Sequence, residues 1–277
     1  MYNDIKIVLA TKHKKENAIQ KPFEDAFNAT IVVPNDYDTD QFGTFTGEIP
    51  RPSSAYDTVI KKANEAASQY GFDYAIANEG SFGPHPTIFF VPGDIELISF
   101  VDNKNDFVVI ESEITTETNY AHRDITIADE YADFLEKINF GSHGLILRSL
   151  DTNAIIAKGI TQLEELHSIV KSSFKNQSTI RLETDMRAMM NPTRMRIINK
   201  LAIKLVQRLQ KKCFQCKAHG FGKTSVTGKL LCGSCGTETE LYKFKVLSCI
   251  KCDYQEFYPR ADKLEYADQQ YCPYCNP

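Results

Sequence analysis

The sequence of 277 residues contains no tryptophan, and its first 212 residues contain no cysteine. It also lacks an apolar run near the roughly 18 residues that a membrane-spanning helix requires. Its first residues show no basic segment followed by an apolar one, which is the pattern of a secretory signal. Since 42% of the residues are hydrophobic, the composition is not that of a disordered chain. We therefore expect a cytoplasmic globular protein of one or two domains, with no part in a membrane.

Acidic residues are absent from one stretch of the chain. Residues 186–237 carry 11 basic side chains and no acidic one, whereas residues 1–185 have a net charge of −13 and residues 238–277 of −2. A basic stripe beside an acidic body is typical of a surface that binds an anion, such as nucleotide phosphate or RNA. It is equally typical of a helix and tail that dock on the acidic part of their own chain. The charge pattern leaves both readings open.

Hydrophobic periodicity predicts alternating strands and helices over residues 1–212. The expected strands are 5–10, 29–33, 74–77, 87–91, 95–101, 107–114, 145–147, 154–157 and 179–183. The expected helices are 16–27, 126–138 with Thr126 as its N-cap, 162–174, 193–212, and one from Ser53 or Ser54 to about Tyr70. This order predicts an α/β domain over residues 1–212, in which helices flank a mixed sheet with an antiparallel patch.

All eight cysteines occur in residues 213–277, as four C-x2-C pairs. The pairs are Cys213/Cys216, Cys232/Cys235, Cys249/Cys252 and Cys272/Cys275. Fifteen residues separate the first two pairs and 19 separate the last two, which is the spacing of zinc ribbons. Adjacent pairs without a secretory signal favour metal binding over disulfides. We predict a tandem zinc-ribbon domain that holds two Zn²⁺ ions. Sequential pairing is the simplest arrangement, and an interleaved one remains open.

Four cysteines leave no open position on a tetrahedral zinc ion, so the expected role of both ions is structural. The tail is too short to bury a large core, and metal binding would supply its folding free energy. Its many aromatic residues either fill a small core or stack on nucleic-acid bases.

Five segments resemble a bacterial family of unknown function over nearly the whole chain. They are Ala10-Thr11-Lys12-His13, Phe42-Gly43-Thr44-Phe45-Thr46-Gly47-Glu48, Glu79-Gly80-Ser81-Phe82-Gly83-Pro84-His85-Pro86, Glu183-Thr184-Asp185-Met186-Arg187 and Asn191-Pro192-Thr193-Arg194-Met195. This resemblance implies no activity.

The first half of the chain also resembles the inosine/xanthosine triphosphatase-like nucleotide pyrophosphatases. The resemblance implies that Thr11 and either Lys14 or Lys15 hold substrate phosphates after the first strand, and that Glu79 holds a metal ion. It is carried further by Asp57-Thr58, by Ala63-Asn64 with Ala66, and by Asn191-Pro192-Thr193-Arg194 at the start of a basic helix. His13 stands where that family usually has Asn, and Gly141-Ser142-His143-Gly144 replaces a Tyr-Asp-Pro segment. These departures fall on the base pocket, so a purine preference is not implied.

The chemistry of phosphoanhydride hydrolysis indicates the same residues. It needs Mg²⁺ on the phosphates, carboxylates that hold the metal and orient water, and cations that offset the developing charge. The candidate catalytic carboxylates are Glu48, Asp57, Glu79 and Asp185. The candidate phosphate-binding residues are Thr11, His13, Lys14, Lys15, Asn64, Arg187 and Arg194. Lys62 is a further candidate phosphate contact, although a solvated surface lysine is the simpler interpretation of it. Glycines 80 and 83 predict a tight turn that presents Glu79, whereas Asp185 either orients water or pairs with Arg187.

The leading interpretation is a Mg²⁺-dependent nucleotide pyrophosphatase with a structural zinc tail. The alternatives are a non-catalytic nucleotide- or RNA-binding protein, and an inactive scaffold that docks a protein partner through the tail. Homo-oligomerisation is compatible with all three.

Overall fold

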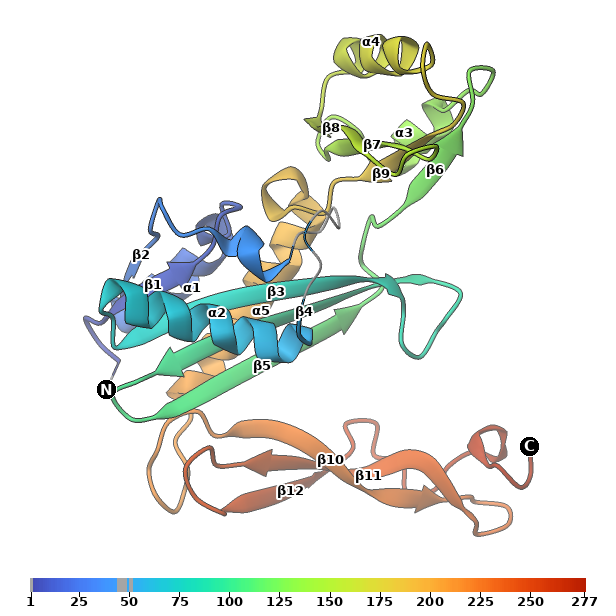
Figure 1. The fold of residues 1–277 in the computed structure, drawn as a ribbon. Coiled ribbons are helices and arrows are strands. Elements are labelled where there is room, and N and C mark those ends of the chain that lie inside the picture. The colour runs from blue at the N-terminus through green and yellow to red at the C-terminus, as the bar shows by residue number, and fades with distance from the viewer. Residues whose placement is uncertain (1, 44–48, 50–51) are drawn as a thin grey trace. The chain divides into compact units, whose positions relative to one another are not determined.

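The computed structural model describes residues 2–43, 49 and 52–277. The chain forms two compact units, which divide inside the long helix α5 (Pro192–Gln210). The first unit extends to Val206, and the second, here called the zinc module, comprises Gln207–Pro277 (Figure 1). Among the described residues no helix is both long and apolar enough to cross a membrane.

A five-stranded sheet forms the centre of the first unit, in the order β2-β1-β3-β4-β5. The strands are β1 (Lys6–Ala10), β2 (Thr30–Val32), β3 (Tyr74–Pro84), β4 (Pro92–Asp102) and β5 (Phe107–Thr115). β1 is parallel to β2 and β3, whereas β3, β4 and β5 form an antiparallel meander. Residues 7–10 are all buried, as expected of a parallel strand covered on both faces. The expected mixed sheet is confirmed.

Helices cover both faces of this sheet. On one face α2 (Ala55–Tyr70) packs its alanines against small residues of β1 and β3. The N-cap of α2 is Ser54, whose hydroxyl accepts a hydrogen bond from the Asp57 amide. On the other face Phe23 of α1 (Glu16–Phe27) stacks on Phe100. α5 lies beside α1, since the Asn199 amide group donates to the Ala18 carbonyl.

A second sheet follows β5, in the order β6-β9-β7-β8, and all its strand pairs are antiparallel. Its strands are β6 (His122–Ile125), β7 (Leu145–Ser149), β8 (Ile155–Ile160) and β9 (Ile180–Thr184), and its helices are α3 (Ala132–Lys137) and α4 (Leu163–Ser173). Leu147, Leu166 and Leu182 belong to a separate hydrophobic core that these elements form. The alternation of strands and helices does not reveal this split, because periodicity identifies buried faces without showing which of them share a core.

Three expected elements differ from the structure. Residues 87–91 form a loop rather than a strand, because His85 Nδ1 accepts hydrogen bonds from the Thr87 and Ile88 amides and organises a turn. Residues 78–84 continue β3 and form no turn. The expected helix 126–138 shortens to α3, because the Asp129 carboxylate binds the Thr126 amide and closes a separate turn before it.

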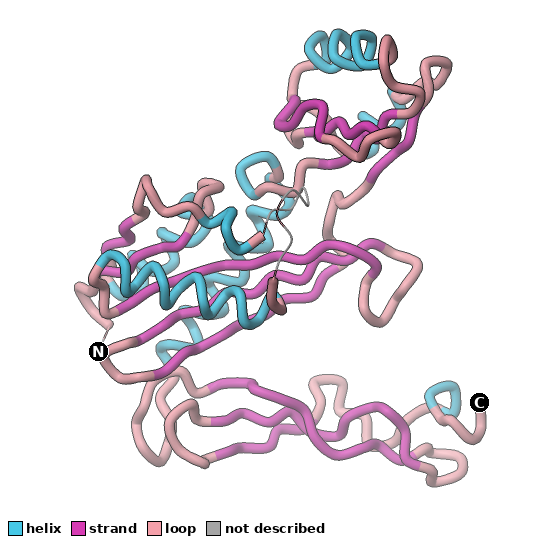
Figure 2. The backbone as a smooth tube through the Cα atoms, viewed as in Figure 1, coloured by secondary structure: helices cyan, strands magenta, loops and turns pink. Residues whose placement is uncertain are grey.

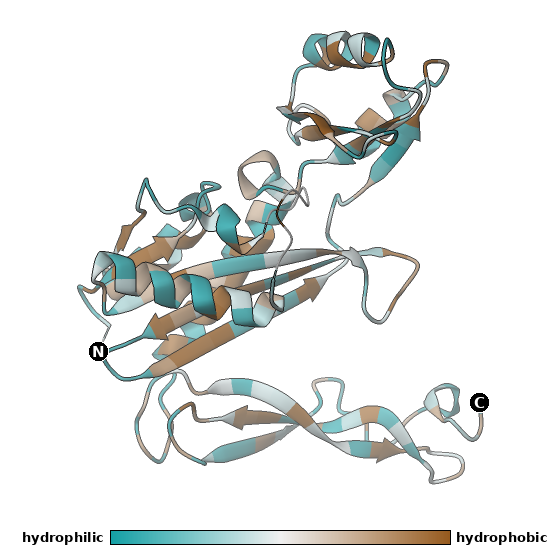
Figure 3. Cartoon of the chain, in the orientation of Figure 1, coloured by the Kyte–Doolittle hydropathy of each residue, from teal (hydrophilic) through white to brown (hydrophobic). Residues whose placement is uncertain are grey.

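The zinc module is an antiparallel sheet of three strands joined by loops, and one short helical turn at Gln269–Tyr271 follows the last strand (Figure 2). The strands are β10 (Gly222–Leu231), β11 (Glu238–Ser248) and β12 (Gln255–Pro259). Hydrophobic and hydrophilic residues are interspersed along all three (Figure 3). Each connection between these strands carries one C-x2-C pair, so the two pairs lie at opposite ends of β11.

Candidate metal centres and a buried charged cluster

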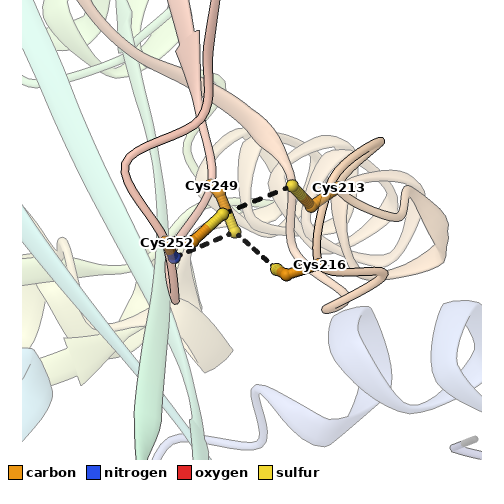
Figure 4. Close-up of side chains that lie close together, drawn as sticks. All are labelled: Cys213, Cys216, Cys249 and Cys252. Carbon is orange, nitrogen blue, oxygen red and sulfur yellow. Dashed lines mark hydrogen bonds between the residues drawn. The ribbon is translucent and has the colours of Figure 1, made fainter.

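The first four-cysteine group joins the segment before β10 to the turn before β12. The sulfur atoms of Cys213, Cys216, Cys249 and Cys252 lie within 4.8 Å of one another and point inward (Figure 4). Sγ–Sγ distances are 3.7 Å between Cys213 and Cys252 and 3.5 Å between Cys216 and Cys249. A tetrahedral ion with Zn–S bonds of about 2.3 Å requires sulfurs about 3.8 Å apart. The group therefore fits a zinc ion.

The second group joins the β10–β11 turn to the segment after β12. It consists of Cys232, Cys235, Cys272 and Cys275, again with all sulfurs within 4.8 Å. The Sγ atoms of Cys232 and Cys275 lie 3.9 Å apart, and those of Cys235 and Cys272 lie 3.5 Å apart. The expectation of two four-cysteine sites in the tail is confirmed.

The pairing is interleaved, and the sequential arrangement is wrong. β10 has 10 residues, and an extended strand rises about 3.3 Å per residue, so about 30 Å of strand separates the first C-x2-C pair from the second. The antiparallel return of β11 carries the third pair back to the first. Spacing alone indicates ligand pairs, whereas the lengths of the intervening strands decide which pairs meet.

Backbone amides surround the sulfurs. The Cys249 sulfur accepts hydrogen bonds from the Lys251 and Cys252 amides, and the Cys272 sulfur accepts one from the Cys275 amide. Such donors favour the thiolate form that binds metal. With four cysteines each, neither group leaves a coordination position open, so the arrangement suits structural ions.

A second group of candidate functional residues lies in the first unit. It consists of six buried ionisable side chains, which we call the charged cluster: Lys15, Lys62, Glu79, Asp94, Glu96 and Arg194. Sequence reasoning identified four of these as site candidates or phosphate contacts and missed Asp94 and Glu96. Buried ionisable groups in such number are uncommon unless they are paired or serve a function.

Lys15 enters the cluster from the start of α1. Its Nζ donates a hydrogen bond to the Asn78 carbonyl over 2.9 Å. Asn78 directly follows the part of β3 that pairs with β1. Burial, followed by the positive charges of Arg194 and Lys62, lowers the pKa of the Lys15 ammonium group to about 7. A proton on this group is therefore held weakly near neutral pH.

Lys62 and Glu79 form an ion pair on the α2 side of the sheet. The Lys62 Nζ lies 2.5 Å from the Glu79 Oε1, and both side chains are buried. Glu79 is therefore placed beside a cation in this structure. An ion pair of this kind is costly to break by removing one partner, because the other charge stays buried.

Arg194 and Glu96 form a second ion pair on the opposite face of the sheet, and both side chains are fully buried. Arg194 Nε lies 2.5 Å from Glu96 Oε1, and its Nη1 donates to the Met186 carbonyl. A Cβ at Gly80 would lie 2.5 Å from the Arg194 guanidinium. Gly80 thus serves close approach of the arginine to the strand, and not a turn as the sequence suggested.

Asp94 lies two residues before Glu96 on β4 and is 1% exposed. Burial and the nearby Glu96 charge raise the pKa of the Asp94 carboxyl group to about 8. Its Oδ1 accepts no hydrogen bond from the described residues, and neither does the buried Oδ1 of Asn78. The sequence signal for Asp94 and Glu96 is that two acidic residues alternate along one strand. This signal did not identify them as site residues, because exposed and buried carboxylates look alike in a sequence.

The other expected site residues lie in varied surroundings. Thr11 is buried, Lys14 is exposed with a positive φ of 56°, and burial together with Lys15 lowers the pKa of His13 to about 4. Asn64 is exposed on α2, and Glu48 lies outside the described residues.

The remaining two candidate carboxylates are engaged by neighbours. Asp57 is exposed at the start of α2, where its carboxylate accepts from Ser54. Asp185 is fully buried and forms an ion pair with Arg187, the second alternative that the sequence allowed. In residues 2–43, 49 and 52–277 the two cysteine groups are the sole sets of three or more Cys, His or acidic ligands close enough to share a metal ion.

The basic face of α5 docks in part on acidic residues of its own unit. Lys200 binds the Glu117 carboxylate over 2.9 Å, and Lys204 binds Glu113 over 3.1 Å. For these cations the structure matches the docking reading of the charge pattern.

A pocket of about 360 Å³ lies beside the charged cluster, between the two sheets of the first unit. Gly80, Phe82 and Met186 contribute to its lining, and each of them also contacts or faces Arg194. Phe82 and Tyr120 both line the pocket and stack on each other, with ring centroids 6.1 Å apart. An aromatic wall next to buried cations suits a ligand with one flat and one anionic part.

A family described as "Domain of unknown function (DUF6671)" matches residues 62–277. The chain belongs to the DUF6671 family. The DUF6671 match begins within α2 and includes Glu79, the second sheet, α5 and both cysteine groups. A search of curated proteins finds no match.

Among solved structures, the protein VC0702 from Vibrio cholerae matches with 11% sequence identity and a TM-score of 0.28. The alignment covers 40% of this chain and 64% of that chain. Similarity at this level carries no argument about the fold or activity of this DUF6671 protein.

Proposed function

We propose that the first unit binds a nucleotide at the charged cluster and hydrolyses a phosphoanhydride bond of it, with Mg²⁺ as cofactor. The observation that carries the proposal is the gathering of three buried cations, Lys15, Lys62 and Arg194. Burial first, and then the charges of Arg194 and Lys62, lower the Lys15 pKa to about 7. A phosphate group would relieve this repulsion. The resemblance of the Thr11–Lys15 loop and Glu79 to the inosine/xanthosine triphosphatase-like family supports the same ligand.

The proposal gives each residue a role. Lys15 and Lys62 contact phosphate oxygens, and Glu79 is the carboxylate for the metal. Mg²⁺ would neutralise charge on the phosphate oxygens and orient the attacking water. Because Lys15 is largely neutral above pH 7, binding of a phosphate raises its pKa and draws a proton from solution.

The test is turnover of a panel of nucleoside triphosphates with Mg²⁺ or Mn²⁺, read as pyrophosphate release. We expect Lys62→Met to lower kcat/KM by about 100-fold, as removal of a transition-state cation does. Lys61→Met is the matched control, since Lys61 is the exposed neighbour on α2 that pairs with Glu65. Absence of turnover on every substrate would overturn the catalytic part of the proposal.

The pairing of the carboxylates favours a second candidate, a non-catalytic nucleotide-binding protein. Glu79 and Asp185 are each engaged by a cation, and Asp57 is exposed beside Ser54. This candidate predicts nucleotide binding that Lys62→Met abolishes, together with proton uptake at pH 8, but no pyrophosphate release. Calorimetry in two buffers of different ionisation enthalpy measures both quantities.

A further inference from the structure

The zinc module contains a groove of its own. Its volume is about 820 Å³, and all its lining residues come from β10, β11, the last residue of β12 and the segment after it. The groove therefore lies wholly within the second unit and is separate from the charged cluster. A volume of this size is in the range of ligand-binding sites.

Cations dominate the charged lining of the groove. Lys229, Lys243, Arg260 and Lys263 line it, and Glu265 is the one acidic residue among them. Acids outside the lining hold two of these cations in place: Glu240 binds Lys229 over 2.8 Å, and Asp262 binds Arg260 over 2.7 Å. These two acids and Glu265 offset three of the four positive charges, so the surplus is small. Among the described residues Lys243 and Lys263 form no ion pair, so these two cations remain available to an anionic ligand.

Aromatic and apolar side chains alternate with these cations. Phe244 and Tyr266 line the groove, and Tyr266 is 60% exposed. Lys243 lies over the Phe244 ring, with its Nζ 5.5 Å from the ring centroid. Positive charge next to an exposed ring, here that of Tyr266, is the combination that binds single-stranded nucleic acid, because every base has a face to stack and every nucleotide a phosphate.

The second cysteine group fixes the wall that carries Tyr266. The Gly233 amide donates to the Ala267 carbonyl, and the Ala267 amide donates to the Leu231 carbonyl. These bonds attach the segment after β12 to the C-x2-C turn at Cys232 and Cys235. The groove is therefore preformed when the second group binds its ion, which lowers the entropic cost of binding.

We propose that this groove binds single-stranded nucleic acid, with a base stacked on Tyr266 and phosphates held by Lys243 and Lys263. An acidic peptide would use the same cations but would not need the ring of Tyr266. A duplex presents no free base face and would not enter a groove of this size.

The experiment uses the zinc-loaded full chain and a fluorescent oligouridine of about 12 nucleotides, with anisotropy as the readout. We expect Tyr266→Ala to weaken binding about tenfold, in line with the loss of one stacked base. Lys243→Met should weaken binding and reduce the slope of log K against log salt by about 0.7. Zinc content of both variants, measured in parallel, shows that the module remains folded.

Matched controls separate the groove from the rest of the chain. Tyr274→Ala changes an aromatic residue that is 76% exposed and outside the groove, and should leave the affinity unchanged. Lys62→Met should also leave it unchanged, so failure of the nucleotide proposal does not affect this one. A duplex or polyglutamate that binds as tightly as oligouridine overturns the proposal, as does equal sensitivity to Tyr266→Ala and Tyr274→Ala.

Discussion

The two units of the chain bury different kinds of side chain. In the first unit an extensive apolar interior surrounds complete ion pairs such as Arg194–Glu96, whose side chains have no exposed surface. In the zinc module three of the few buried residues are cysteines, namely Cys213, Cys232 and Cys272. The first unit has enough apolar burial to offset the cost of desolvating charge. The second has little core, and its folding depends on metal binding.

Removal of zinc tests this difference most strongly. A structural zinc ion contributes about 10–16 kcal/mol of apparent binding free energy, so a chelator should unfold β10–β12 and leave the first sheet folded. Hydrogen exchange followed by mass spectrometry measures protection in both units. Cys216→Ser and Cys235→Ser each remove one ligand from a different group, so each should lower the zinc content from two ions per chain to one. Protection that persists in β10–β12 after chelation would contradict the dependence on metal.

Loss of one buried charge tests the first unit. Arg194→Met leaves Glu96 buried without its cation, and we expect it to lower the free energy of unfolding by about 3–5 kcal/mol. Arg196→Met, on the same helix but with an exposed side chain, should change it by about 0–1 kcal/mol. Urea unfolding of the zinc-loaded chain, followed by a probe in the first sheet, measures both values. Equal effects would mean that the Arg194 pair contributes no more than a surface pair.

A change of pH provides a smaller test of the same unit. The Asp94 pKa is about 8 in the folded protein and 3.8 as a free side chain, so the folded state binds more protons between these values. Asp94 therefore lowers stability progressively as pH rises from about 4 to about 8. Asp94→Asn should become more stable than the parent over this window and keep a constant advantage above it. Thermal unfolding midpoints at pH 5 and pH 8 measure the effect, and a pH-independent difference would contradict it.

The sequence predicted features that depend on local pattern. Cysteine spacing identified two four-cysteine sites, and periodicity identified the mixed sheet and α5. Long-range features were not predictable in this way. The pairing of Cys213 with Cys252 depends on the length and return of β10 and β11, and the second sheet depends on which leucines share a core.

The charged cluster shows the same limit. Glu79 and Arg194 stood out in the sequence because Glu79 follows an expected strand and Arg194 lies at the start of an expected helix. Asp94 and Glu96 lie within a strand and resemble surface acids until the fold buries them. Gly80 was noticed for the wrong reason, since the space that it leaves is filled by the Arg194 guanidinium.

The interleaved zinc sites have a consequence for how the protein is made. Each site joins two C-x2-C pairs whose cysteines are 33 to 43 residues apart, so neither site is complete when only the first two pairs have been synthesised. A growing chain must therefore carry four unpaired thiols until the third pair emerges. During that interval these thiols are open to oxidation and to the wrong metal. Biogenesis of this protein should accordingly be sensitive to the zinc supply during translation, before the folded sites compete with other ligands for zinc.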